Sequence, residues 1–313
     1  MSTLQAGKTI TIGTRGSKLS LVQAELVRSA LLAFYPDVRL HVRTITTRGD
    51  AVQDRPLSEI GGSGLFVKQI EEALRDGYID IAVHSAKDLP SVLPAGMVIA
   101  AYLPRADARD VLVSRTGAGL MDLPAGARVG TSSPRRACLL ASLRPDLTLI
   151  DIRGNVDTRL RKLFDGQYDA VVLAAAGLER LGMLDRVTEW LDPDVFVPAV
   201  GQGALAVEVR ADDSEVRALV GALDDPATST CIRAERAFLA YVGGGCSLPV
   251  AAYARLDGGS VHLTGLIGGP HGRLVRGGRT GPATSPEEQG TALADELLAR
   301  GGRAFVQAAA ERA

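Results

Sequence analysis

Side chains that could bind an anion gather where the stretch GTSSPRR (130–136) leads from an extended segment into a helix. Thr131 and Ser133 provide hydroxyl groups there, and Arg135 and Arg136 provide two guanidinium groups. The free N–H groups at the start of a helix attract anions, whereas cations at that end oppose the helix dipole. The stretch therefore indicates an anion site, and a pair of solvated surface arginines is the alternative.

Three other stretches place arginine or hydroxyl groups in similar surroundings. They are TRGSKLS with Arg15 and Ser17, DIRGNVDTRL with Arg153 and Arg159, and AGLERLG with Arg180. Salt bridges to nearby aspartates could equally explain Arg153 and Arg159, and a solvated surface position could explain Arg180. A single phosphate needs fewer such groups. The set therefore indicates a ligand with several carboxylates, which guanidinium groups bind through paired hydrogen bonds.

The stretch VHSAKDLP (83–90) places Asp88 just after a predicted strand, where α/β sheets commonly bind ligands. A carboxylate at such a place can stabilise a developing cation or transfer protons. Ser85 and Asp88 also have the spacing of a helix capping box, which is the alternative. His84 is expected to be a structural histidine.

Three glycines precede Cys246 in GGGCSLP (243–249), and a proline follows closely. Glycine adopts backbone conformations that other residues avoid, and it leaves space beside the thiol. Two interpretations are open. The thiol carries a covalent group, or it is a small buried residue beside a turn.

The composition argues against several other classes of protein. The chain has 313 residues, a formal net charge of -1 and 4% aromatic residues, which disfavours nucleic-acid binding. The three cysteines and four histidines lack metal-ligand spacing, and no GxxxxGK[ST] phosphate loop is present. No apolar run is long enough to cross a membrane, and residues 1–16 lack a secretory signal. We therefore expect a soluble, cytosolic protein.

Alternating strand and helix signals between about residues 9 and 210 predict an α/β fold with mostly parallel sheets. Residues 18–34 are predicted to form a helix that begins after Ser17 and buries a stripe through Leu26 and Phe34. Residues 47–64 have no clear period and are a candidate lid. From about residue 226 onward, a helix followed by short strands with Gly-Gly turns predicts a small antiparallel α+β domain.

Nine stretches together resemble the porphobilinogen deaminase family, also called hydroxymethylbilane synthases. They are IGTRGSKLSLVQA, TTRGD, GLFVKQIE, DIAVHSAKDLP, VGTSSPRRA, RGNVDTRL, LAAAGLERLG, PAVGQGA and GGGCSLPV. They occur in the family's order and cover nearly the whole chain. The combination is specific, although no single stretch is.

The resemblance implies an enzyme of tetrapyrrole biosynthesis that joins four porphobilinogen molecules head to tail with release of ammonia. The family carries a dipyrromethane cofactor, built from its own substrate, on a cysteine thioether, and the matching residue is Cys246. Water releases the linear product hydroxymethylbilane, and the cofactor stays behind. Each pyrrole carries two carboxylates, which agrees with several anion sites on one protein.

Matching positions imply the roles of further residues. Asp88 corresponds to the family's catalytic aspartate, which stabilises the cationic intermediate and the pyrrole N–H groups. Cofactor binding is implied for Lys87, Thr131, Ser133, Arg135, Arg136, Arg153 and Arg159, and substrate binding for Arg15, Ser17, Gln23 and Arg180. No metal is implied. The family commonly has a lysine where this chain has Ser63, and Pro134 replaces a more usual aliphatic residue.

The family's fold implies two domains that resemble periplasmic binding proteins and a small C-terminal α+β domain that carries Cys246. Domain 1 is expected over residues 1–103 and 200–221, domain 2 over 104–199 and domain 3 over 222–313. A cytoplasmic monomer is expected, with porphobilinogen as its small-molecule partner and with no nucleic acid or membrane.

Two other classes of function stay open at this point. One is a protein that binds a polycarboxylate without chemistry. The other is an acyl-transfer enzyme with a cysteine nucleophile, which would need a histidine base.

Overall fold

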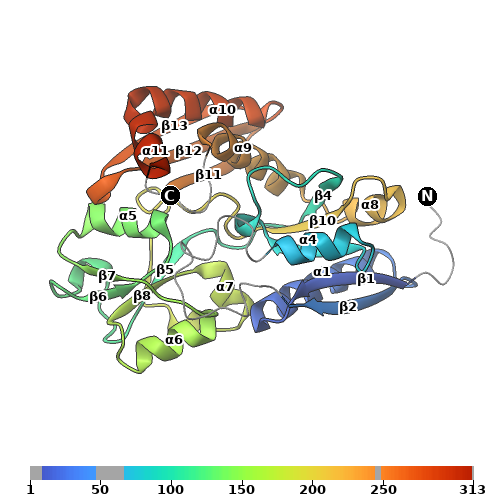
Figure 1. Cartoon of the computed structure of the whole chain (residues 1–313), viewed down its shortest axis with the longest axis horizontal. Helices are drawn as coiled ribbons and strands as arrows, with labels where there is room; N and C mark the ends of the chain where they lie inside the picture. Colours follow the sequence, from blue (N-terminus) through green and yellow to red (C-terminus); the bar gives the residue numbers. More distant parts are fainter. Residues whose placement is uncertain (1–8, 47–66, 244–247, 312–313) are drawn as a thin grey trace. The chain divides into compact units, whose positions relative to one another are not determined.

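A computed structural model describes residues 9–46, 67–243 and 248–311, which form two compact units (Figure 1). The first unit takes the described residues up to 106 together with 204–229, and the second takes 107–203 together with the residues from 230 onward. The second unit includes both a five-stranded sheet and the C-terminal elements, so a separate third domain stays a prediction. None of the helices in these ranges is long and apolar enough to cross a membrane.

The first unit is built on five strands, β1 (Thr9–Arg15), β2 (Arg39–Ile45), β3 (Ile81–Ser85), β4 (Met97–Tyr102) and β10 (Leu205–Arg210), with helices α1 (Lys18–Phe34), α4 (Lys68–Arg75) and α8 (Ser214–Gly221). The strand order is β2-β1-β3-β10-β4. β1 pairs in parallel with β2 and β3, whereas β10 lies antiparallel between β3 and β4. Four strands therefore share one direction, and β10 is reversed.

The two faces of this sheet pack against different helices. Ile12, Val83 and Val207 pack with α1 and α8 on one face, whereas Ala82 packs with α4 on the other. The stripe predicted for α1 is wrong, because Leu26 and Phe34 are exposed and the helix buries Ser20, Gln23, Ala24, Val27 and Leu31. Apolar residues occur around most of this helix, so periodicity alone cannot select the buried face.

The second unit repeats this arrangement with β5 (Asp110–Ser114), β6 (Arg128–Gly130), β7 (Thr148–Ile150), β8 (Ala170–Ala174) and β9 (Glu189–Trp190), and with α5 (Pro134–Leu143), α6 (Val156–Phe164) and α7 (Ala175–Arg180). The order is β7-β6-β8-β5-β9. β5 is antiparallel to both of its neighbours, while β6 is parallel to β7 and β8. The predicted mostly parallel sheets thus have one reversed strand each, which is the first strand after the chain enters or re-enters that unit.

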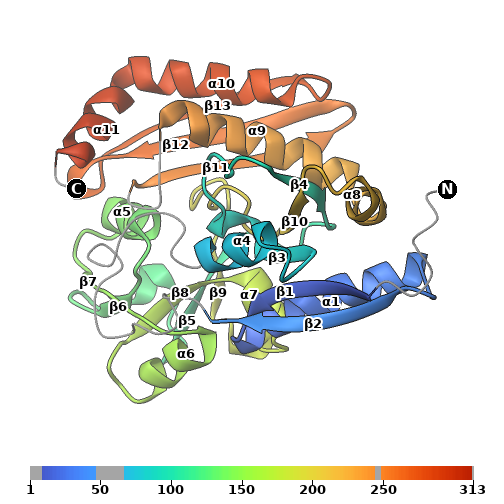
Figure 2. The same cartoon turned by 45° about the vertical axis from the view of Figure 1, so that its right-hand side comes forward.

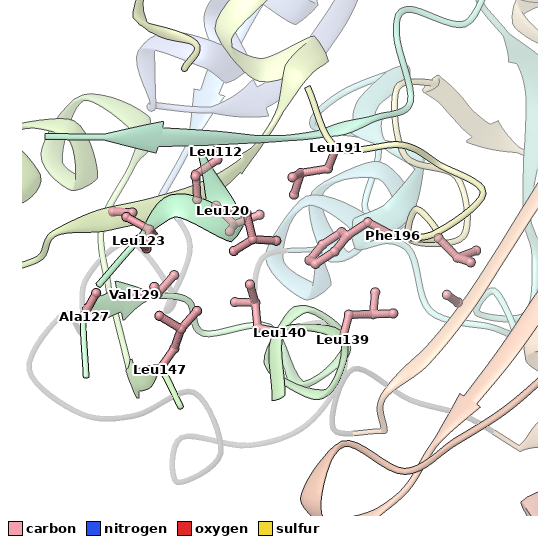
Figure 3. Packing of buried hydrophobic residues seen from close by; sticks show 14 of the residues in the cluster. Leu112, Leu120, Leu123, Ala127, Val129, Leu139, Leu140, Leu147, Leu191 and Phe196 are labelled. Atoms are coloured by element: carbon pink, nitrogen blue, oxygen red, sulfur yellow. The ribbon is translucent and has the colours of Figure 1, made fainter. Parts of the chain in front are cut away.

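Leucines fill the core between this sheet and α5. Leu139 and Leu140 of α5 pack in one buried cluster with Leu112 and Val129 of the sheet (Figure 3). Phe196 belongs to the same cluster. The opposite face of the sheet packs with α6 and α7. Burial on both faces fixes the ends of β5 and β6, from which the candidate anion site is built.

The C-terminal elements are α9 (Pro226–Val242), β11 (Val250–Asp257), β12 (Ser260–Gly268), β13 (Leu274–Pro282), α10 (Pro286–Leu297) and α11 (Arg303–Ala310). The three strands form an antiparallel sheet, as predicted, and α9 and α10 lie along it (Figure 2). Short helical turns occupy Ala86–Asp88, Leu120–Asp122, Leu184–Arg186, Pro270–Gly272 and Leu298–Gly302. The fold class is α/β with an additional sheet-and-helix region at the C-terminus.

Candidate functional site

The turn that carries Asp88 is anchored to its own unit by two hydrogen bonds. Ala86 N donates to the carbonyl oxygen of Ala204 at 3.0 Å, and the Ser85 hydroxyl accepts from Nε2 of Gln23 at 3.0 Å. Ser85 makes no capping hydrogen bond, so the capping-box alternative is wrong. The half-buried Asp88 carboxylate makes no hydrogen bond or ion pair with any residue that the structure describes.

The junction between β1 and α1 places three of the predicted substrate-binding residues near this turn. Ser17 caps α1 as predicted, because its hydroxyl accepts from Ser20 N at 3.2 Å. Gln23 is buried and connects α1 with Ser85. Arg15 ends β1, which is the parallel neighbour of β3. The substrate roles of Arg15, Ser17 and Gln23 stay predictions, as does the role of Lys87 beside Asp88.

A buried acidic cluster formed by β3, β10 and α4 was not predicted from the sequence. Nε2 of His84 lies 2.9 Å from Oε2 of Glu208, and both side chains are buried, which confirms the structural role predicted for His84. Glu71 of α4 is buried as well, and Oε1 of Glu71 and Oε1 of Glu208 have no hydrogen-bond partner among the described residues. Burial, followed by the charge of Glu208, raises the pKa of Glu71.

In the second unit, the loop after β6 uses its hydroxyl groups to begin α5. Thr131 Oγ1 accepts from Ser133 N at 3.2 Å, and Ser133 Oγ accepts from Arg136 N at 3.4 Å. Ser133 is the N-cap and Pro134 the first helical residue. Both hydroxyl groups serve here as acceptors, and each keeps its own hydrogen to donate to an anion.

Arg135 and Arg136 are buried, so the alternative of solvated surface arginines is wrong. They share Asp110, the first residue of β5, which is fully buried. Arg135 Nη1 donates to Oδ2 of Asp110 at 2.7 Å, and Arg136 Nη2 donates to Oδ1 at 2.6 Å. Gln202 Nε2 also donates to Oδ1, at 3.0 Å. The sequence analysis missed Asp110 and Gln202, because neither lies in the stretch that contains the arginines.

This cluster has an excess of positive charge, since two guanidinium groups face one carboxylate. Burial by itself would raise the pKa of Asp110, but the charges of Arg135 and Arg136 outweigh it and hold that pKa well below its usual range. Burial lowers the pKa of Arg135 against the opposing effect of Asp110. Nε of Arg135 is buried and has no hydrogen-bond partner among the described residues. A buried cationic group with an unused donor is a suitable place for an anion.

The other predicted arginines of the second unit lie on neighbouring segments. Arg159 Nε donates to the carbonyl oxygen of Gly154 at 2.8 Å, and Arg153 precedes that glycine. Arg180 Nη2 donates to the carbonyl oxygen of Gly203 at 2.7 Å, and burial lowers the pKa of Arg180. Arg180 is therefore not the solvated surface residue that the alternative assumed. Its contact with a ligand stays a prediction, as do those of Arg153 and Arg159.

Two of the predicted features lie outside the described residues. They are Cys246 and the candidate lid at residues 47–64, which includes Ser63. The two cysteines within the described ranges, Cys138 and Cys231, are both buried. Across those same ranges, no group of three or more His, Cys, Asp or Glu side chains is arranged to hold a metal ion.

Solved structures match this chain with low sequence identity and low TM-scores. The periplasmic VFT2 domain of Bordetella pertussis BvgS is 14% identical, with a TM-score of 0.42 over 68% of this chain and 85% of that domain. The OxyR2 regulatory domain of Vibrio vulnificus is 14% identical, with a TM-score of 0.43 over 71% of this chain and 98% of that domain.

Sequence comparisons cover both units. A family model described as "Porphobilinogen deaminase, dipyromethane cofactor binding domain" matches residues 10–218, and one described as "Porphobilinogen deaminase, C-terminal domain" matches residues 229–299. The porphobilinogen deaminase of Roseiflexus sp. (strain RS-1) is 60% identical over 96% of this chain and 99% of that protein. The porphobilinogen deaminase of Syntrophobacter fumaroxidans (strain DSM 10017 / MPOB) is 47% identical over 96% of this chain and 97% of that protein. The chain therefore belongs to the porphobilinogen deaminase family, which polymerises porphobilinogen in tetrapyrrole biosynthesis and carries a dipyrromethane cofactor.

Proposed function

We propose that Asp88 is the catalytic carboxylate of this enzyme and that Arg135, with the hydroxyl groups before it, holds a carboxylate of the cofactor. The observation that carries the proposal is the buried surplus of positive charge around Asp110. Arginines without enough acidic partners are costly to bury, because an unpaired charge loses its hydration. An anionic ligand removes that cost.

The described residues fit a dipyrromethane, whose rings carry acidic side chains. The unpartnered Nε of Arg135 offers a charged donor, and Ser133 and Thr131 offer hydroxyl hydrogens at the same helix start. Matching positions in the family add Lys87, Arg153 and Arg159 to the groups that would hold it. When bound, the dipyrromethane supplies the free pyrrole α-carbon to which the first substrate molecule is joined.

The proposed role of Asp88 is electrostatic. Loss of ammonia from porphobilinogen leaves positive charge on the substrate, and a nearby carboxylate lowers the energy of that charge, most strongly where water is scarce. Asp88 is half-buried and has no cationic partner among the described residues, so its charge is not already compensated there. The same carboxylate can accept hydrogen bonds from pyrrole N–H groups and take up a proton. Arg15, Ser17, Gln23 and Arg180 are proposed to bind the substrate's own carboxylates.

The proposed attachment point is the Cys246 thiol. Burial raises the pKa of the Cys138 thiol, which keeps it protonated and unreactive, and Cys231 is buried within α9. We expect the intact mass of the purified protein to exceed the sequence mass by two pyrrole units. Cys246→Ser should lose this excess, whereas the control Cys231→Ser should keep it. An unmodified mass in active wild-type protein would contradict the covalent cofactor.

A colour reaction with an acidic aldehyde reagent gives an independent check for bound pyrroles. It should be positive for wild-type protein and for Cys231→Ser and negative for Cys246→Ser. A positive reaction in Cys246→Ser would move the attachment to another residue.

The oligomeric state, the substrate and the cellular location of the protein are part of the same proposal. We expect a cytoplasmic monomer that acts on porphobilinogen and needs neither nucleic acid nor membrane. Support comes from the family to which the chain belongs. Sedimentation of the purified protein with and without porphobilinogen tests the monomer, and a stable dimer in both conditions would overturn it.

A further inference from the structure

The two arginines of the buried cluster are used unequally. All three guanidinium nitrogens of Arg136 donate to protein acceptors: Nε and Nη2 to Oδ1 of Asp110, at 3.0 and 2.6 Å, and Nη1 to the carbonyl oxygen of Val172 at 2.8 Å. Toward the described residues, Arg135 donates only through Nη1, to Asp110 and to the carbonyl oxygen of Val197, both at 2.7 Å. Its Nε is buried and has no hydrogen-bond partner in that part of the chain.

This difference has a geometric consequence. A guanidinium group binds a carboxylate best through two neighbouring N–H groups, and Nε together with Nη2 forms such an edge. In Arg136 that edge is engaged by Asp110. In Arg135 the contacts lie on the opposite side, at Nη1, so the Nε edge faces away from its protein partners.

Asp110 is itself held firmly. It is fully buried at the start of β5, where that strand pairs with β8. Gln202 Nε2 donates to its Oδ1 at 3.0 Å and to the carbonyl oxygen of Ala108 at 2.7 Å. The carboxylate therefore has little freedom to turn, and its Oδ2 is directed at Nη1 of Arg135.

We propose that Asp110 is a positioning residue: it takes Arg136 as its counter-charge and holds Arg135 by Nη1, so that the Nε edge of Arg135 stays open for a ligand carboxylate. This inference rests on the proposed function, because the carboxylate belongs to the pyrrole ligand. It assigns the two arginines different tasks. Arg135 binds the ligand, and Arg136 fixes Asp110.

A double-mutant cycle separates positioning from simple stabilisation. The variants are Asp110→Leu, Arg136→Met and the two combined, each made in cells that lack porphobilinogen so that the protein is obtained without cofactor. Two quantities are measured: the Tm, and the porphobilinogen concentration that gives half-maximal covalent loading by intact mass. The double variant removes one charge of each sign, so the cluster keeps its net charge, and relative to Arg136→Met it lacks only the carboxylate that orients Arg135.

Asp110→Leu alone leaves two buried guanidinium groups without a counter-charge, and its Tm should fall by about 10 °C or the protein should fail to fold. In the double variant the Tm should return to within about 3 °C of that of Arg136→Met. Half-maximal loading of the double variant should still need roughly ten times more porphobilinogen, the loss expected for a misplaced charged hydrogen bond. Arg136→Met removes one positive charge from the cluster but leaves Asp110 to hold Nη1 of Arg135, so it should need clearly less additional porphobilinogen than the double variant does.

Two results would overturn the proposal. If the double variant loads like Arg136→Met, Asp110 only stabilises the fold. If Arg136→Met loads as poorly as the double variant, Arg136 itself contacts the ligand. Failure of wild-type protein to gain two pyrrole units would instead defeat the proposed function, and with it the ligand role assigned to Arg135.

Asp169 offers a matched control in the same unit. It also pairs with two arginines, Arg115 at 3.1 Å and Arg128 at 3.2 Å, but these groups are partly exposed. Asp169→Leu should lower the Tm only slightly, because solvent replaces the lost partner, and should leave half-maximal loading unchanged. An effect on loading as large as that of the double variant would show that any loss of an acidic partner impairs loading.

Discussion

The two five-stranded sheets have the same strand order, with one reversed strand in the same position. They differ in their buried charged groups: acidic groups are in excess in the first unit, and guanidinium groups are in excess in the second. In the first unit the reversed strand β10 carries Glu208, which pairs with His84 and has Glu71 as an acidic neighbour. In the second unit the reversed strand β5 carries Asp110, which is shared by Arg135 and Arg136. Both acids on the reversed strands are fully buried.

The comparison shows that the architecture places a buried acid but does not decide the sign of the site around it. Within the described residues of the first unit, no arginine or lysine is hydrogen-bonded to Glu208, and His84 is its hydrogen-bond partner. In the second unit the start of α5 supplies two guanidinium groups to one acid. The buried cluster of the first unit therefore contains an excess of acidic groups, whereas that of the second unit contains an excess of guanidinium groups.

The largest expected effect comes from Asp88→Asn. Without its negative charge, the turn cannot stabilise the cation left by ammonia release, and we expect turnover to fall at least about 100-fold. The Tm should change little, because Asp88 makes no hydrogen bond within the described residues. Ammonia release measures the turnover, and intact mass shows that the cofactor is still attached.

The matched control for this variant lies in the second unit. Asp122 also ends a one-turn helix, Leu120–Asp122, but it is exposed. Asp122→Asn should keep wild-type turnover. Normal turnover in Asp88→Asn would remove the functional contrast between the two units and leave Asp88 as an ordinary turn residue.

Local signals explain what could be predicted from the sequence. The start of α1 after Ser17 was predicted because a small hydroxyl residue stands directly before the helix, and this cap is present. Ser133 caps α5 in the same way. Gly77 and Gly243 follow α4 and α9, and both have positive φ angles of 73°, which glycine adopts readily. The family resemblance supplied Asp88 and the arginines, but not how those arginines are held.

The features that escaped prediction depend on residues far apart in the chain. Asp110 meets Arg135 only because β5 and α5 pack in one unit, and Glu208 meets His84 only because β10 inserts beside β3. No local spacing connects these residues. The buried face of α1 also depends on a distant residue. The polar Gln23 is buried where it donates to the Ser85 hydroxyl, and hydrophobic periodicity gives no sign of this contact.

A smaller effect is expected from the buried pair of the first unit. Glu208→Leu leaves the His84 ring without its hydrogen-bond partner, which should cost about 1–3 kcal/mol and lower the Tm by about 5 °C. Glu208→Gln keeps a hydrogen-bond acceptor for His84, so its Tm should fall less than that of Glu208→Leu. Thermal unfolding of both variants tests this order. A loss in Glu208→Leu as large as that of Asp110→Leu would show that both sheets depend equally on their buried acids.

The smallest effect concerns pH, and it distinguishes the two clusters by the direction of a pKa shift. Burial and then Glu208 raise the pKa of Glu71 above its ordinary value of 4.5, with smaller opposing effects from His84 and Arg75. The folded protein therefore binds this proton more tightly than the unfolded chain does. The stability that this tighter binding provides is complete when the pH is below the ordinary pKa of 4.5. It is lost as the pH rises through the higher pKa that Glu71 has in the folded protein. The pKa of Asp110 is lowered instead, so the stability that Asp110 contributes is present at higher pH and is lost as the pH falls.

Glu71→Gln removes this titration, so the Tm of the variant relative to wild type should rise by a few degrees between about pH 5 and about pH 8. Glu72→Gln is the matched control on the same helix, because Glu72 is less buried than Glu71, and its difference from wild type should stay nearly constant. Thermal unfolding at a series of pH values measures both. If the advantage of Glu71→Gln grew as the pH fell, Glu71 would be stabilised in its charged form. The first unit would then hold its buried acid as the second unit holds Asp110, and the contrast between the two sheets would be lost.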